Sequence, residues 1–362
     1  MSHRACYIVA AALPPRFGWQ VRARGVRAEQ LAAQARLSFE EVHIILFLER
    51  FDNINADRGF AILAPAREDT TLIPVGAFEA FADRLPPSTF VFSQSEFVEK
   101  AAHAALRHDV VYDILAPSEV TLRQSGASDA EIRQLQFSHR RMVRLARRII
   151  VNGEKSARYF ADDLREREHV IAPLAPELTD AGPRTRTHLL FGGPFPRWTD
   201  VTPIFATMSA FAAASPQVPI IMMAPRGLKE DANALEYSAL WLMPQVTPMW
   251  NLSAQNDAEI LSRCFGFVDW APLNGERAHT TSLRTLQAVA AGVPVLHQMG
   301  TGLDLLWDPF PGERLATPIT PQDVAAFVAK AKAGVYREAV ESARRQLSGL
   351  RSDPTPFAGL AA

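Results

Sequence analysis

The sequence lacks the short motifs that most often mark a nucleotide, nucleophile or metal site. It contains no G-x-G-x-x-G fingerprint, no G-x-x-x-x-G-K-[ST] phosphate loop, no D-x-D and no G-x-S-x-G nucleophile elbow. The nine histidines are scattered, and His103 and His108 do not have the spacing of two ligands on one helical face. A zinc site is therefore not expected, and neither is a dinucleotide cofactor.

Cysteine, net charge and long hydrophobic runs are also scarce. The formal net charge of the 362 residues is −1, so nucleic acid is not expected as a partner and a small-molecule substrate is favoured. The two cysteines, Cys6 and Cys264, stand in apolar surroundings, which fits a reducing cytoplasm. The longest uncharged stretch, 205–225, is interrupted by Pro216 and Pro219, so no membrane-spanning segment is predicted.

Length and patterning indicate two α/β domains. A chain of 362 residues is too long for one ordinary core. Apolar runs alternate with helical patterns in both halves, which is typical of parallel sheets covered by helices. Residues 173–186 lose this periodicity and gain proline, so they are predicted to link an N-terminal domain, 1–172, to a C-terminal domain, 187–350. Residues 351–362 are expected to form a loose tail.

The expected elements follow from apolar periodicity and from glycine and proline stops. In the first domain we expect strands at 6–11, 42–47, 89–92, 110–113 and 149–151, and helices at 26–35, 95–106 and 130–147. In the second domain we expect strands at 188–191, 219–223, 265–268 and 293–296, and helices at 202–214, 229–240 and 321–347, with a further helix after residue 282.

The most informative stretch is 274–297. Hydroxyl side chains at 280–282 suit a helix N-cap, and apolar residues then recur at helical spacing. Gly292 ends this helix, and the apolar run 293–296 has the character of a buried parallel strand. Because a helix N-terminus beside a parallel sheet binds anions, this stretch predicts an anion site.

Three segments resemble GT-B-fold glycosyltransferases, particularly the family-4-like group. NGERAHTTSLRTLQAVAAGVPVLH, at 274–297, is similar to the segment in which a polar loop and a helix N-terminus hold a nucleotide-sugar diphosphate. FGGPFPRWTD, at 191–200, resembles the strand and glycine turn that open the C-terminal domain of that family. VVYDILAPSE, at 110–119, is similar to the strand and loop that those proteins place across the cleft.

The resemblance implies an α/β GT-B fold, with two Rossmann-like domains facing a central cleft and the donor held mainly by the second. It implies a hexosyltransferase that moves a sugar from a nucleotide-diphosphate sugar to a glycan, lipid-linked or protein acceptor, as in polysaccharide biosynthesis. We expect no metal and no cofactor besides the donor. Two alternatives stay open: a nucleotide-sugar epimerase of the same fold, and a catalytically silent binding module.

The sequence departs from that family where the family keeps two glutamates eight positions apart, because His279 and Gln287 stand there. Gln287 can still bond ribose hydroxyls, without the strength of a charged carboxylate, whereas His279 does not match a retaining mechanism. The family's basic pair falls on Pro194 and Thr199, which leaves nearby arginines as diphosphate ligands. The candidate donor-binding residues are Gly192, Gly193, Arg197, Arg226, His279, Thr280, Thr281, Ser282, Leu283, Arg284 and Gln287.

These residues also have plain structural interpretations. The two glycines would serve a tight turn at the end of a strand, and the hydroxyl residues at 280–282 would serve only as the cap of their helix. Each arginine would be a solvated surface side chain. Acceptor deprotonation needs a base, for which Asp113 and Glu276 are the candidates. Asp113 ends a predicted strand at the edge where ligands bind, with an N-cap as its alternative role; Glu276 lies in the donor loop, where a surface role is the alternative.

A basic stretch lies near the end of the first domain. Its members are Arg140, Arg141, Arg144, Arg147 and Arg148. Such a helix can touch anionic lipid head groups, which would suit a lipid-linked acceptor at the inner face of the membrane. A solvated helix face packed over the N-terminal sheet is the alternative.

Overall fold

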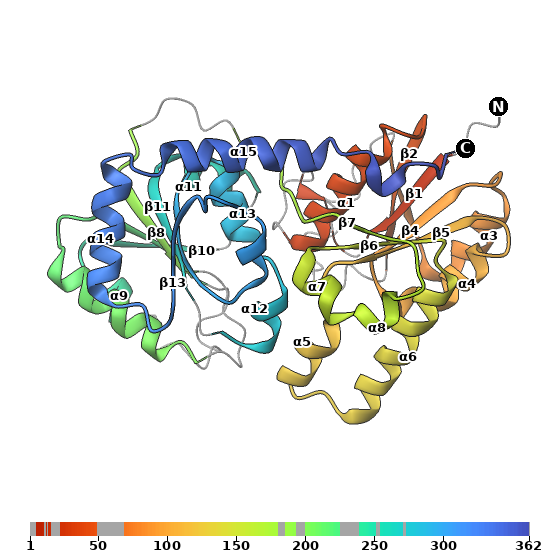
Figure 1. The fold of residues 1–362 in the computed structure, drawn as a ribbon, viewed down its shortest axis with the longest axis horizontal. Coiled ribbons are helices and arrows are strands. Elements are labelled where there is room, and N and C mark those ends of the chain that lie inside the picture. The colour runs from red at the N-terminus through yellow and green to blue at the C-terminus, as the bar shows by residue number, and fades with distance from the viewer. Residues whose placement is uncertain are drawn as a thin grey trace. The chain divides into compact units, whose positions relative to one another are not determined.

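The computed structural model describes residues 5–10, 12, 14–15, 22–48, 69–179, 185–192, 200–224, 239–250, 254–270 and 273–361. The chain forms two compact units (Figure 1). Unit 1 comprises Met1–Ala175 and Gly349–Ala362, and unit 2 comprises Pro176–Ser348. The first division, after Ala175, falls within the stretch predicted as a linker. The second division, after Ser348, lies close to the predicted end of the C-terminal domain at residue 350, but the sequence did not assign the segment that follows to the first unit.

Unit 1 contains a seven-stranded parallel sheet in the order β3-β2-β1-β4-β5-β6-β7. Its strands are β1 (Ala5–Ala10), β2 (Glu41–Phe47), β3 (Thr70–Ile73), β4 (Thr89–Phe92), β5 (Asp109–Ile114), β6 (Arg148–Val151) and β7 (His169–Ile171). The first strand pairs on both sides, so Cys6 lies opposite Val42 and Thr89. Because both of its faces are covered, every residue of β1 is buried, which explains its continuous apolar run.

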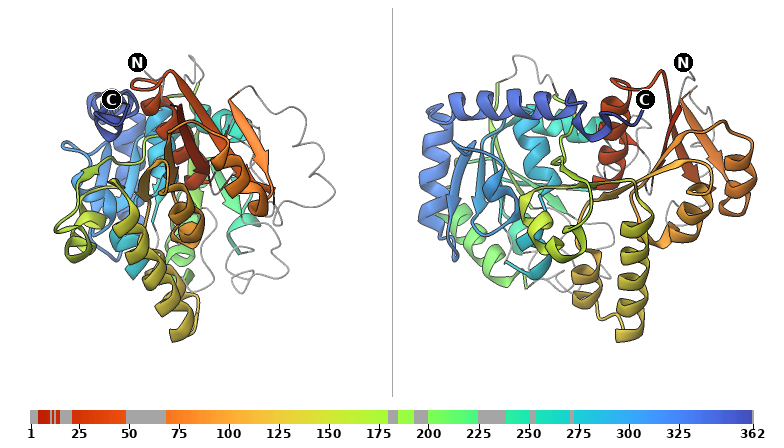
Figure 2. Two further views of the ribbon diagram at one scale, coloured as in Figure 1. Left: turned by 90° about the vertical axis from the view of Figure 1, so that its right-hand side faces the viewer. Right: turned by 45° about the vertical axis from the view of Figure 1, so that its right-hand side comes forward.

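Helices cover both faces of this sheet. They are α1 (Ala23–Ala35), α3 (Phe78–Asp83), α4 (Val98–Ala104), α5 (Ser118–Gln124), α6 (Asp129–Leu145), α7 (Glu154–Tyr159) and α8 (Ala161–Leu164). Alternate residues of β1 point to opposite sides, so Tyr7 packs in the core with α3, α4 and α6, and Ile8 packs in the core with α1. A capping box between Ser128 and Glu131 begins α6, which lies beside α5 (Figure 2).

The C-terminal segment is an ordered part of unit 1, so the prediction of a loose tail over 351–362 is wrong. Phe357 and Leu360 are buried in the core beside α1. The Phe357 ring meets Phe39 edge to face, with 6.1 Å between ring centroids. The buried amide of Gln34 also donates a hydrogen bond to the Leu350 carbonyl at 2.7 Å. The tail is therefore fixed by partners more than 300 positions away, which no local pattern reveals.

Unit 2 contains a six-stranded parallel sheet in the order β10-β9-β8-β11-β12-β13. Its strands are β8 (His188–Gly192), β9 (Ile220–Ala224), β10 (Val246–Trp250), β11 (Cys264–Asp269), β12 (Val295–Gln298) and β13 (Gly312–Leu315). From β8 the chain adds strands outward on one side and then returns to the other side with β11. The strand order therefore reverses between β8 and β11, which is the topological switch point of this sheet.

The helices of unit 2 are α9 (Thr202–Ala214), α11 (Ala254–Ser262), α12 (Gly275–His279), α13 (Leu283–Ala290), α14 (Pro321–Lys332) and α15 (Arg337–Arg351), the last of which continues past Ser348 into unit 1. Leu189 and Phe191 of β8 face a core with α9 and α14, which lie side by side in Figures 1 and 2. Residue 190 points to the opposite face, where α11 and α13 lie.

The predicted helices of this unit have mixed outcomes. The expected helix at 321–347 is two helices, because Gly334 takes a φ of 73° and turns the chain between them. Most of the expected helix at 229–240 lies outside the described residues. Within the described part of the chain, no helix is long and apolar enough to cross a membrane.

Candidate functional site

The switch point of unit 2 lies where β8 ends at Gly192 and β11 ends at Asp269. In open α/β sheets, ligands bind outside the carboxyl ends of the strands at this point. Gly192 has a φ of 90°, and a Cβ there would lie 2.8 Å from the carbonyl oxygen of Met223 on β9. Only glycine fits this approach of the two strands. The need for glycine at 192 is thus explained by strand packing, and Gly193 lies outside the described residues.

Helix α13 begins beside this edge of the sheet. Ser282 is its N-cap and accepts a hydrogen bond from the Thr285 backbone N–H at 3.4 Å. Leu283 is the first helical residue, and Gly292 closes the helix end in the left-handed region at a φ of 75°. The predicted cap, helix and glycine stop are confirmed. The positive end of the helix dipole is therefore presented at the carboxyl edge.

The residues before the cap are held by a second loop. The carbonyl oxygen of Thr280 accepts a hydrogen bond from the Gly302 N–H at 3.0 Å. A Cβ at position 302 would lie 2.4 Å from that oxygen, so glycine is required for this contact. The backbone that leads through Thr281 into α13 is fixed by this packing.

Arg284, in the first turn of α13, reaches the end of β8. Its Nη1 donates a hydrogen bond to the Gly192 carbonyl at 2.9 Å and lies 3.6 Å from the Sδ of Met223. Two residues predicted separately from sequence, Gly192 and Arg284, are thus brought together at the switch point. A guanidinium in this position can also offer donors to an anion at the helix start.

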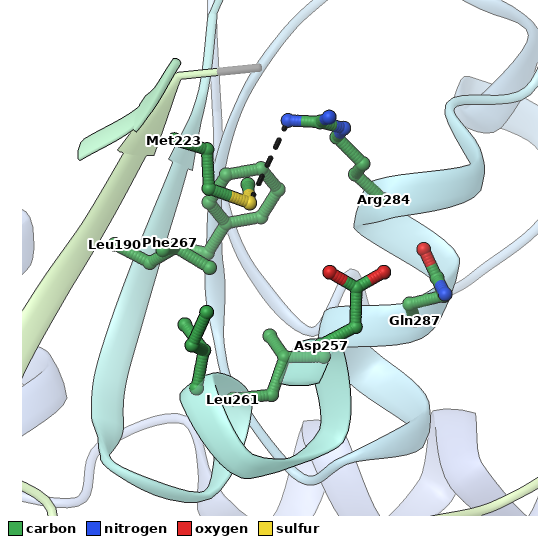
Figure 3. A pocket seen from close by; sticks show the side chains of 8 residues that line it. Leu190, Met223, Asp257, Leu261, Phe267, Arg284 and Gln287 are labelled. Atoms are coloured by element: carbon green, nitrogen blue, oxygen red, sulfur yellow. Dashed lines mark hydrogen bonds between the residues drawn. The ribbon is translucent and has the colours of Figure 1, made fainter. Parts of the chain in front are cut away.

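A small pocket opens beneath Arg284, between α11, α13 and the sheet (Figure 3). It is lined by Leu190, Met223, Asp257, Ile260, Leu261, Phe267, Arg284 and Gln287. Its cavity volume is about 20 Å³, which is room for roughly one water molecule. The predicted residues Arg284 and Gln287 therefore share one pocket, and its remaining polar residue, Asp257, was not predicted.

Asp257 lies on α11, with its carboxylate directed toward the side of the pocket that α13 forms (Figure 3). Burial raises the pKa of this carboxyl to about 6, against the opposing effects of the Arg284 charge and a hydrogen bond from Gln287. The sequence offers one signal for Asp257: it lies near the start of a helix that follows a strand. Such a helix begins at the carboxyl edge of the sheet, where α13 also begins.

Asp269, at the end of β11, anchors the start of α13. Its Oδ2 accepts a hydrogen bond from the Thr285 hydroxyl, and its Oδ1 lies 3.5 Å from the Arg277 guanidinium. Burial raises the pKa of Asp269, but Arg277 and hydrogen bonds from His297 and Ser282 outweigh it and hold the pKa well below its usual value. The carboxylate is therefore ionised and fixes α12 and α13 to the sheet.

His297 extends this anchor on β12. Its side chain is fully buried, with Nδ1 3.4 Å from the Asp269 carboxylate and Nε2 2.8 Å from the Thr301 hydroxyl. The sequence analysis did not select Asp269 or His297. Each follows the end of a predicted strand directly, and a position at the end of a strand was the criterion by which Asp113 was selected.

Glu276 and His279 lie on α12, the short helix before α13. The Asn274 side chain caps α12 by accepting the Arg277 backbone N–H at 2.9 Å. Neither Glu276 nor His279 lines the described pocket. Arg197 and Arg226 lie outside the described residues.

Asp113 lies in a different setting from the one predicted, because it is paired with a buried arginine. It lies within β5 rather than at a helix cap, and its side chain is fully buried. Its Oδ1 accepts hydrogen bonds from Arg27 Nη2 at 2.7 Å and Nε at 3.0 Å. Because both side chains of this ion pair are fully buried, we interpret the pair as structural.

The basic stretch of unit 1 is largely paired with carboxylates. The ion pairs join Arg140 to Asp163, Arg141 to Glu99, Arg147 to Asp109 and Arg148 to Glu168. Arg148 also donates a hydrogen bond to the Ala358 carbonyl of the C-terminal segment at 2.6 Å. This local charge balance favours the solvated-face interpretation over contact with lipid.

Comparison with known proteins identifies the architecture. No protein-family model matches the chain, and no curated protein matches it by sequence. HepE of Anabaena, solved with UDP-glucose, is similar with a TM-score of 0.67 and 13% identity over 99% of this chain and 98% of that chain. Sucrose-phosphate synthase of Thermosynechococcus elongatus is similar with a TM-score of 0.65 and 13% identity over 99% and 96% of the two chains.

A third similar structure is the N-terminal domain of trehalose-6-phosphate phosphatase of Candida albicans. Its TM-score is 0.63 and its identity 10%, over 99% of this chain and 96% of that chain. At such identities the likeness is one of fold, which is the GT-B fold with two Rossmann-like domains. The predicted fold class is confirmed.

Proposed function

We propose that this GT-B chain is a glycosyltransferase whose unit 2 holds a nucleotide-diphosphate sugar at the carboxyl edge of its sheet. The observation that carries the proposal is the contact of Arg284 with the Gly192 carbonyl. It places a guanidinium and the positive end of α13 together at the switch point. The presence of UDP-glucose in the similar HepE structure supports a donor of this class.

The chemistry follows from where charge develops. The bond between the sugar and the diphosphate breaks, the sugar bonds to an acceptor hydroxyl, and that hydroxyl loses its proton. The leaving nucleoside diphosphate gains negative charge, which the start of α13 and Arg284 would stabilise. As proposed, this positive charge comes from the chain itself, without a metal ion or a further cofactor.

The donor-side roles are then distributed along one segment. The backbone at Thr281, Ser282 and Leu283 would approach the diphosphate, and Gln287 would face the sugar part of the nucleotide. Glu276 remains the proposed base for an acceptor that is a glycan, a lipid-linked glycan or a protein.

Calorimetric titration with UDP, ADP and GDP tests the proposal. Arg284→Ala should weaken binding of the preferred nucleotide about 10- to 100-fold, because a hydrogen bond to a charged group contributes about 1.5–3 kcal/mol. Arg263→Ala is a matched control, since Arg263 is an exposed arginine before the amino end of β11. Arg284→Lys should fall between these variants, because a lysine keeps the charge and loses the fork.

The same proteins, incubated with a panel of nucleotide sugars, separate the activities. Nucleotide release with transfer of the sugar to water or an acceptor supports the transferase. A nucleotide sugar recovered with an altered sugar identifies an epimerase, and tight binding without turnover identifies a silent module. If the wild-type protein binds no nucleoside diphosphate, the proposal fails as a whole.

A further inference from the structure

The pocket beneath Arg284 contains a carboxylate that the proposed function has not used. We propose that Asp257 and Gln287 form a subsite for two neighbouring hydroxyl groups of the donor's pentose, with Asp257 as the charged acceptor. This inference rests on the proposed function, because it places a nucleotide at the start of α13. Its new content is that the ionic group of the subsite comes from α11.

The position of the pair fits one sugar ring next to a phosphate. Gln287 follows Arg284 by three residues, so both side chains lie on one face of α13, about one helical turn apart. A ligand that bonds to Arg284 with its phosphate therefore has its adjacent ring at the level of Gln287. Asp257 approaches the same space from α11, on the other side of the pocket (Figure 3).

The chemistry of the lining fits hydroxyl groups. A carboxylate accepts hydrogen bonds from two hydroxyls, and an amide can both accept and donate, so the pair matches a vicinal diol. The apolar side chains of Leu190, Met223 and Phe267 line the pocket from the sheet. A cavity of about 20 Å³ admits the hydroxyl edge of a ring rather than a whole ring or a base.

In the free protein Asp257 accepts a hydrogen bond from Gln287 and feels the positive charge of Arg284, but burial removes more solvation than these two groups replace. Burial outweighs both Arg284 and Gln287 and raises the pKa of Asp257. Two hydroxyl groups would replace part of the hydration that the carboxylate has lost. A ligand without one of these hydroxyls would leave the buried carboxylate short of a partner, and this produces discrimination.

The experiment compares each ribonucleoside diphosphate with its 2′-deoxy analogue by calorimetry, using UDP, ADP and GDP. The wild-type protein should bind the ribose form of its preferred nucleotide about 10- to 100-fold more tightly than the deoxy form. Asp257→Asn should reduce this ratio to within about threefold, mainly by weakening the ribose form. Glu259→Gln is the control, because Glu259 is an exposed carboxylate on the same helix.

A rescue variant separates loss of charge from loss of structure. Asp257→Asn combined with Gln287→Glu moves the carboxylate across the pocket and should restore the preference for ribose. Melting temperatures of all variants identify any that fail to fold. If Asp257→Asn is among them, the ribose preference of the double variant shows whether the carboxylate in the pocket is the group that binds the hydroxyls.

The outcomes are distinct. If the wild-type protein binds a nucleoside diphosphate but Asp257→Asn keeps the full ribose preference, the subsite is overturned and the proposed function stands. If the wild-type protein shows no ribose preference, the subsite is overturned in the same way. If the wild-type protein binds no nucleoside diphosphate, the proposed function is overturned and the subsite with it.

Discussion

Replacing Arg27 with methionine should destabilise unit 1 strongly, because Arg27 is the buried partner of Asp113. Both side chains have 0% exposure, and two guanidinium nitrogens donate to one carboxylate oxygen at 2.7 and 3.0 Å. The third nitrogen donates to the Ala172 carbonyl at 2.8 Å and to Gln30 at 3.1 Å. Methionine keeps an unbranched stem of similar length and removes all of these donors.

The expected loss is about 3–5 kcal/mol, the range for breaking a buried ion pair by removing one partner. Unit 1 comprises 189 residues. At this size, 1 kcal/mol corresponds to a shift of roughly 2–4 °C in melting temperature, so the variant should melt about 6–20 °C lower. Differential scanning calorimetry measures this shift, and urea titration followed by circular dichroism gives the free energy of unfolding.

Arg36→Met is the matched control, because Arg36 is also an arginine paired with an aspartate and directly follows α1. Its pair with Asp69 has the same 2.7 Å separation, but the side chains are 45% and 29% exposed. Solvent screening limits such a pair to about 0–1 kcal/mol. If Arg27→Met loses no more stability than Arg36→Met, the argument from burial is refuted.

A double replacement tests the role of Asp113 directly. Arg27→Met combined with Asp113→Leu removes both charges and should recover most of the lost stability. Because we assign Asp113 to structure, this double variant should also keep the activity of the wild-type protein. A stable but inactive double variant would show that Asp113 takes part in the reaction after all.

Two further predictions concern the tail and the pocket carboxylate. Phe357→Ala should cost about 3–5 kcal/mol in urea unfolding, because its ring is fully buried, whereas Phe137→Ala, at a ring that is 61% exposed, should change stability by no more than about 0.5 kcal/mol. Equal effects would mean that the tail is not packed. Folding raises the pKa of Asp257 from 3.8 to about 6. Between pH 3.8 and about pH 6 the folded state therefore binds more protons than the unfolded state, and the free energy of unfolding falls as the pH rises through this range. The loss is about 3 kcal/mol, at about 1.36 kcal/mol for each pH unit, and Asp257→Asn should lack it. The difference in unfolding free energy between wild type and Asp257→Asn, measured from pH 4.5 to pH 7, should therefore change by most of this amount; a constant difference would contradict it.

Local signals were enough for the elements that carry the fold. The strand predicted at 89–92 and the helix predicted at 202–214 have the observed bounds of β4 and α9. A buried parallel strand is a continuous apolar run in the sequence, and a helix shows apolar residues at helical spacing together with capping residues. Both kinds of element are therefore determined by residues that are close together in the chain. The start of α13 and its glycine stop were determined in the same way.

Three short strands were not predicted, because they depend on a neighbouring strand rather than on their own sequence. β3, β7 and β13 each have three or four residues and are only partly apolar, so their own sequence does not distinguish them from loops. They become strands because a neighbouring strand offers unpaired hydrogen-bonding groups at the sheet edge.

The sequence by itself therefore determined two α/β domains and an anion-ready helix start at Ser282, because these depend on residues close together in the chain. Only the tertiary structure decided which distant groups meet. It joined Asp113 to Arg27, packed Phe357 against Phe39, and brought Asp257 to Gln287. The charge and burial of a side chain depend on such partners, so the role of each carboxylate could be assigned only after folding placed it.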